Sequence, residues 1–75
     1  MKQISPEEME AIKQIEKEME ENGGYILQGR LADILIEHLL TYDGAKNVLD
    51  YLGFKHPKVR HYIHERLRAE YTKHQ

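Results

Sequence analysis

The last third of the chain gathers most of the side chains that could do chemistry. Residues 51–75 hold six of the eleven Lys and Arg residues and four of the five His residues, against two Glu, a formal charge of +4. The imidazoles add positive charge near or below about pH 6.5. Lys and Arg bind phosphates and guanine edges, and His can donate a hydrogen bond to either. The segment therefore favours contact with an anionic partner.

The same residues give little support to metal binding or covalent catalysis. His61 and His64 lie three positions apart, a helical spacing at which two imidazoles can share one metal, and His56 precedes them. No carboxylate completes a convincing ligand set with these histidines, and the chain has no Cys. Ser5 has the position of a helix cap rather than of a nucleophile. We therefore expect no metal site, no cofactor and no enzyme activity.

Composition and charge distribution define the class of protein. Hydrophobic residues make up 40% of the chain and charged residues 32%, which is typical of a globular domain. Residues 1–22 carry seven Glu against three Lys, net −4, while the whole chain carries −2. The apolar runs are far shorter than the roughly 20 residues that span a bilayer, and the N-terminus lacks an apolar signal core. We expect a cytoplasmic protein with no membrane partner.

The clearest structural signal is an acidic N-terminal helix over 5–22. Ser5 can cap its first amides, Pro6 suits the first helical position, and Glu8 completes a capping box. Gly23 and Gly24 are expected to end it, since Gly tolerates a left-handed conformation.

The apolar side of this helix is one narrow stripe, so we expect it to pack on the rest of the domain or on a second copy. A homodimer is therefore predicted. The residues expected at a protein interface on this helix are Met9, Ile12, Ile15, Glu16, Met19 and Glu20.

Three further helices are predicted to form a tri-helical core over 25–72. The most hydrophobic, 25–41, is expected at the centre, with regular helix beginning near Gln28–Arg30 because Gly29 weakens its first turn. Asp43 is expected to cap the third helix and Gly53 to stop it. The fourth is expected to open at His56–Pro57. The predicted fold is an all-α, compact four-helix domain, with the whole chain 1–75 forming a single domain.

Residues 45–64 resemble the helix-turn-helix unit of DNA-binding proteins. The resemblance rests on Leu52-Gly53-Phe54, then Val59, then Tyr62-Ile63. In such a unit Gly53 takes a positive φ after the first helix and Phe54 closes the corner. Val59 and Ile63 then pack the second helix against the first.

The resemblance implies that the fourth helix enters the major groove of duplex DNA. The chain would then be a small DNA-binding protein for transcription regulation. The cationic or hydrogen-bonding side chains expected to contact the DNA are Lys55, His56, Lys58, Arg60, His61, His64 and Arg68.

A protein-binding module, acting as an antagonist or adaptor, is the alternative function. The Glu-rich face of the first helix could dock on a basic protein partner without any nucleic-acid contact. Surface tyrosines would suit such an interface, since an aromatic ring with a hydroxyl serves both apolar and polar contacts. The five tyrosines are Tyr25, Tyr42, Tyr51, Tyr62 and Tyr71.

Overall fold

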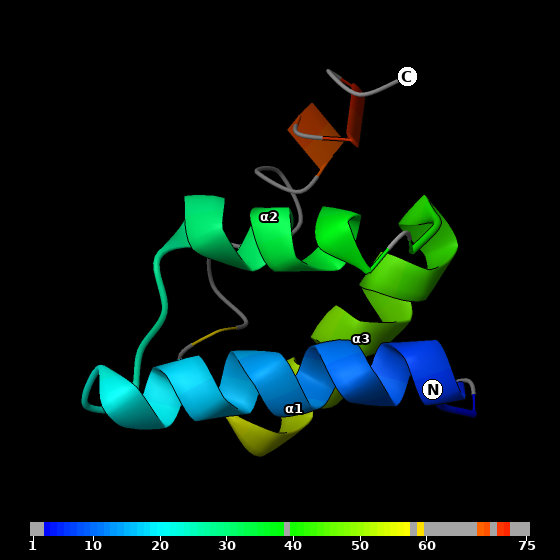
Figure 1. Cartoon of the computed structure of the whole chain (residues 1–75). Coiled ribbons are helices and arrows are strands. Elements are labelled where there is room, and N and C mark those ends of the chain that lie inside the picture. Colours follow the sequence, from blue (N-terminus) through cyan, green and yellow to red (C-terminus); the bar gives the residue numbers. More distant parts are fainter. Residues whose placement is uncertain (1–2, 39, 58, 60–67, 70, 73–75) are drawn as a thin grey trace.

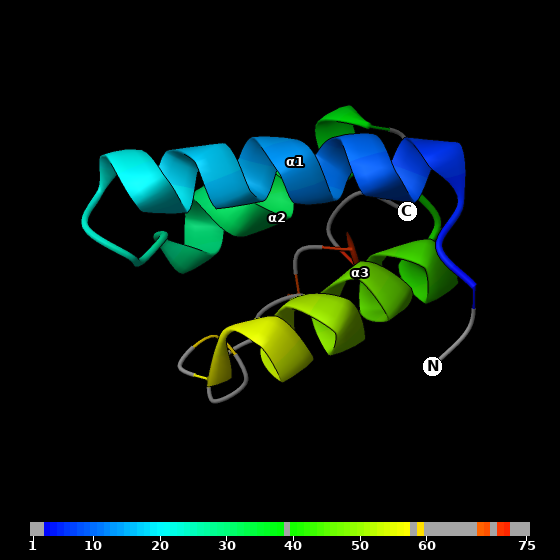
Figure 2. The same ribbon diagram turned by 90° about the horizontal axis from the view of Figure 1, so that it is seen from below.

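A computed structural model describes residues 3–38, 40–57, 59, 68–69 and 71–72 of the chain. Within these residues the protein is all-helical, with α1 over Pro6–Glu21, α2 over Gln28–Glu37 and α3 over Tyr42–Lys55. α1 and α2 run antiparallel, and α3 lies on another side of α1 (Figures 1 and 2). The all-α fold class is thus confirmed. The predicted fourth helix falls largely outside the described residues.

The acidic helix α1, rather than the second helix, occupies the centre, because it packs against both α2 and α3. Its buried residues are Ala11, Ile12, Ile15 and Met19. They share one core with α2, α3 and Val59, whose side chain is fully buried. Val59 belongs to the same core as Val48, Leu49 and Leu52, whereas Ile63, its predicted companion in this packing, lies outside the described residues.

The predicted caps of α1 are present at both ends. Ser5 Oγ accepts a hydrogen bond from the Glu8 amide at 3.2 Å, and the Glu8 carboxylate accepts one from the Ser5 amide at 3.4 Å. At the other end Gly23 and Gly24 have φ of 76° and 101°, and the Gly24 amide donates to the Met19 carbonyl at 2.7 Å. These two positions need glycine, because a Cβ disfavours a left-handed backbone.

Both predicted ends of α3 are wrong by two or three residues. Thr41 is the N-cap in place of Asp43, and its hydroxyl accepts a hydrogen bond from the Gly44 amide at 3.0 Å. Gly53 does not stop the helix, which continues to Lys55 with Gly53 buried inside it. Pro57 accounts for the actual end, since the residue before a proline is pushed out of the helical region, and His56 has φ −129° and ψ 82°.

The cap at Thr41 leads to a stability prediction. Thr41→Ala should lower the free energy of unfolding by about 1 kcal/mol, because it removes a side-chain acceptor from the first turn of α3. Asp43→Ala should cost about 0.5 kcal/mol or less, since Asp43 lies in the first turn and contributes only its charge. Urea unfolding of both variants checks the order, and a larger loss in Asp43→Ala would restore Asp43 as the cap.

Candidate functional site

A carboxylate of α1 holds the C-terminal end of α3. Glu16 Oε2 accepts hydrogen bonds from Lys55 Nζ at 3.2 Å and from His56 Nε2 at 3.0 Å. Lys55 lies in the last turn of α3, and His56 is its C-cap. Glu16 is half-buried. Its two hydrogen bonds join α1 to the end of α3, about 40 residues further along the sequence.

This bridge sets the ionisation of its members. Partial burial raises the pKa of Glu16, but the hydrogen bonds from His56 and Lys55 outweigh it, so the pKa lies below its ordinary value. The hydrogen bond to Glu16 raises the pKa of Lys55, and the neighbouring Tyr51 contributes in the same direction. Glu16 therefore stays a carboxylate and Lys55 an ammonium at neutral pH.

The lowered pKa of Glu16 predicts a pH effect on stability. Its contribution is fully present above the ordinary pKa of 4.5 and is lost as the pH falls through the lower pKa of the folded state. Glu16→Gln should therefore lower the melting temperature at neutral pH and flatten its fall in acid. Melting curves between about pH 7 and pH 2.5 check this. An unchanged acid slope in Glu16→Gln would mean that the bridge contributes nothing.

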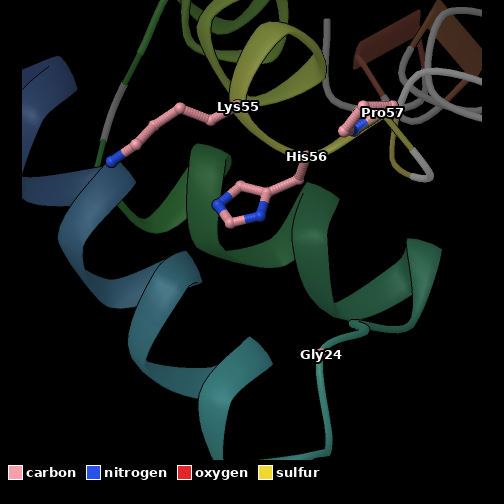
Figure 3. Close-up of a pocket in the computed structure, with 4 residues that line it drawn as sticks. All are labelled: Gly24, Lys55, His56 and Pro57. Carbon is pink, nitrogen blue, oxygen red and sulfur yellow. The ribbon is translucent and has the colours of Figure 1, made fainter.

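A small pocket opens beside this bridge. It has a volume of about 250 Å³ and is lined by Gly24, Lys55, His56 and Pro57. Figure 3 shows Lys55 and His56 reaching from the end of α3 toward the first two helices, with Gly24 on the opposite side. The volume is below the 300–1,000 Å³ that is usual for small-molecule sites.

Three large apolar side chains stand exposed on the two segments that line this pocket. Phe54 is 73% exposed, Leu27 70% and Tyr25 58%. Tyr25 follows Gly24 in the α1–α2 connection, and Phe54 precedes Lys55 in α3. Figures 1 and 2 both place that connection and the end of α3 in the same half of the molecule. We call Tyr25, Leu27 and Phe54 the apolar set.

Two members of the apolar set depart from the sequence-based prediction. Phe54 was expected to close a corner after Gly53, but α3 continues past Gly53 and carries Phe54 to the side opposite its core residues. Leu27 lies within the segment 25–41 that was predicted to be the most hydrophobic helix. It is instead the N-cap of α2, has an extended backbone and supplies no side-chain hydrogen bond.

Only part of the predicted DNA-binding set can be placed. Lys55 and His56 are engaged by Glu16, and Arg68 is exposed. The remaining four residues, Lys58, Arg60, His61 and His64, lie outside the described residues. Gly53 and Phe54, predicted to form the turn, lie inside α3, and beyond α3 the Val59 amide donates to the His56 carbonyl at 2.9 Å.

The predicted interface on α1 is largely internal. Ile12, Ile15 and Met19 belong to the core of the same chain, so they cannot face a second protein while this fold persists. Met9 is partly buried against that core, and Glu20 is exposed. Of the described tyrosines only Tyr25 is largely exposed, and Tyr62 lies outside the described residues. His38, the partly buried C-cap of α2, lies with its Nε2 2.8 Å from Gln14 Oε1.

Searches of protein-family models, curated proteins and solved structures find no match for the chain. Among the described residues, no helix combines the length and apolarity that crossing a bilayer requires. No group of three or more His, Asp or Glu side chains in that part of the chain is arranged to hold a metal ion.

Proposed function

We propose that the chain is a protein-binding module that docks through the apolar set of Tyr25, Leu27 and Phe54. The observation that carries the proposal is the exposure of these side chains, by more than half of their surface, on the two segments that line one pocket. Burying a side chain of this size contributes about 1.5–3 kcal/mol. A partner that covers the apolar set would bury apolar surface that the folded chain alone leaves exposed to water, and this burial would favour binding.

The position of Leu27 strengthens this argument. N-caps favour Ser, Thr, Asp and Asn, whose side chains satisfy a free amide and stabilise a helix by about 1 kcal/mol. Leu27 gives α2 no such bond and faces solvent. A residue that breaks a local rule without a gain to the fold is typical of a functional position.

The described part of the chain favours a protein partner over DNA. Lys55 and His56 both donate to Glu16, so the positive charge of Lys55 is already partly neutralised within the chain. An approaching phosphate would also meet the Glu16 carboxylate. DNA binding by the basic C-terminal segment remains a prediction and is treated as a competing outcome.

Affinity capture tests the proposal. The immobilised chain should retain a specific protein from an extract of its native cells after nuclease treatment. The double variant Leu27→Ser/Phe54→Ser should lose that protein, whereas Lys13→Ser, at an exposed position of α1, should keep it. Equal retention by the double variant would overturn the proposal. Loss of the retained protein on nuclease treatment, with salt-sensitive binding of duplex DNA, would favour the DNA-binding function instead.

A further inference from the structure

Resting on the proposed function, we infer that the segment seated on the apolar set is a cationic amphipathic helix of the partner. The inference concerns the chemistry of the occupant and draws on charge as well as apolarity. It follows from which carboxylates around the apolar set are paired within the chain and which are not.

Among the described residues at this end of the molecule, carboxylates hold three basic side chains. Arg30 of α2 makes a two-pronged ion pair with Glu18, its Nε and Nη2 lying 2.8 and 2.9 Å from the two carboxylate oxygens. Lys55 and His56 are bound by Glu16. These basic groups attract an anionic partner only weakly, because a carboxylate of the same chain lies beside each of them.

Three exposed carboxylates lie close to the apolar set along the chain and have no such partner among the described residues. Glu20 and Glu21 end α1 a few residues before Tyr25, and Asp50 lies one helical turn before Phe54 on the same side of α3. None of the three makes an ion pair with another described residue. Lys17 is the exposed cation closest to Glu20 and Glu21 along α1, so these described residues together with Asp50 keep a net negative charge.

The placement of Glu20 and Glu21 works against the fold. A helix carries partial negative charge at its C-terminal end, where Lys and Arg are favourable and Glu is not. The last turn of α1 contains no basic residue. A cationic partner would remove this repulsion and neutralise Asp50, whereas an anionic partner would increase it.

The described surface favours a helical occupant over an extended one. No strand occurs among the described residues, so an extended peptide has no sheet edge there with which to pair. A helix satisfies its own backbone and can present apolar side chains to the apolar set and Lys or Arg to the carboxylates. Such a helix therefore complements both the apolar side chains and the carboxylates of this surface.

A pair of synthetic peptides tests the inference. One is a helix of about 18 residues built from Leu and Lys with Leu at i, i+3, i+4 and i+7, and the other has Glu in place of Lys. We expect the full chain to bind the Leu–Lys peptide, more weakly in high salt, and to ignore the Leu–Glu peptide. Equal binding of both peptides, or binding of the Leu–Glu peptide alone, would overturn the inference.

Matched charge variants locate the contact. Glu20→Gln/Glu21→Gln should weaken binding of the Leu–Lys peptide about tenfold at low salt, whereas Glu7→Gln/Glu10→Gln, at the far end of α1, should change it less than about twofold. The melting temperatures should move in opposite senses, because Glu7 lies at the favourable end of the helix dipole and Glu20 and Glu21 at the unfavourable end. Unchanged affinity in Glu20→Gln/Glu21→Gln would place the peptide elsewhere and overturn the inference.

Failure of the inference can be told from failure of the proposed function. If neither peptide binds, yet nuclease-resistant capture still depends on Leu27 and Phe54, the docking surface stands and the cationic helix is wrong. If capture does not depend on Leu27 and Phe54, the docking surface itself is wrong. A dimer that sedimentation detects, and that Leu27→Ser dissociates, would make a second copy the occupant and also overturn the inference.

Discussion

Replacing Ile15 with aspartate is expected to unfold the chain rather than to separate two copies of it. Ile15 is 0% exposed in the core that α1 shares with α2 and α3. The substitution loses about 2–3 kcal/mol of apolar burial and adds a buried charge that costs several kcal/mol more. At about 0.05–0.15 kcal/mol per residue, the whole domain has only about 4–11 kcal/mol of stability.

Circular dichroism and gel filtration distinguish an apolar stripe that packs in the core of one chain from a stripe that forms an interface between two copies. Ile15→Asp should lose its helical signal, Ile15→Val should melt slightly below the wild type, and Lys13→Asp, on the exposed side of α1, should remain folded. An Ile15→Asp chain that keeps its helicity and melting temperature while its mass falls by half would show that the stripe is an interface between copies.

Substituting Leu27 and Phe54 is expected to weaken partner binding strongly without lowering the stability of the fold. Each residue, as an exposed anchor, should contribute about 2 kcal/mol to partner binding, so the double Ser variant should bind about 1,000-fold more weakly. Leu27→Ser alone should raise the free energy of unfolding by about 0.5–1 kcal/mol, because serine supplies the cap that α2 lacks. Phe54→Ser should leave stability almost unchanged, since the side chain is largely exposed.

Thermal melts paired with affinity measurements on the single variants check this separation. A stabilised Leu27→Ser chain with weakened binding is the expected result. If both variants melt well below the wild type, the two side chains serve the fold rather than a partner, and their exposure has no functional meaning.

The sequence was most informative where a local chemical rule acts alone. The capping box of Ser5 and Glu8 and the glycines after α1 were predicted correctly, because each depends on neighbours within a few residues. The end of α3 was wrong because Gly53 and Pro57 offer two competing stops, and a buried glycine can remain helical. With Pro57 as the stop, helical stepping would have placed Phe54 opposite Leu52 and predicted its exposure.

The candidate site was less predictable than the fold. The bridge of Glu16 to Lys55 and His56 joins residues about 40 positions apart, and no local pattern reveals such a pair. The predicted start of regular helix near Gln28–Arg30 agrees with the extended backbone of Leu27, but the helical spacing that Leu27 shares with Leu31 hid its exposure. The gradient from an acidic first helix to a basic last segment was visible in the sequence, but its partial neutralisation within the chain was not.

Cross-linking from position 54 tests the docking surface most directly. A photoreactive phenylalanine analogue at Phe54 preserves the aromatic ring, and the same analogue at Lys13 is the control on the exposed side of α1. The proposed function predicts that irradiation in nuclease-treated native extract gives a discrete covalent protein adduct from position 54 and none from position 13. Adducts that are absent at position 54, or equally abundant at both positions, would contradict docking through the apolar set.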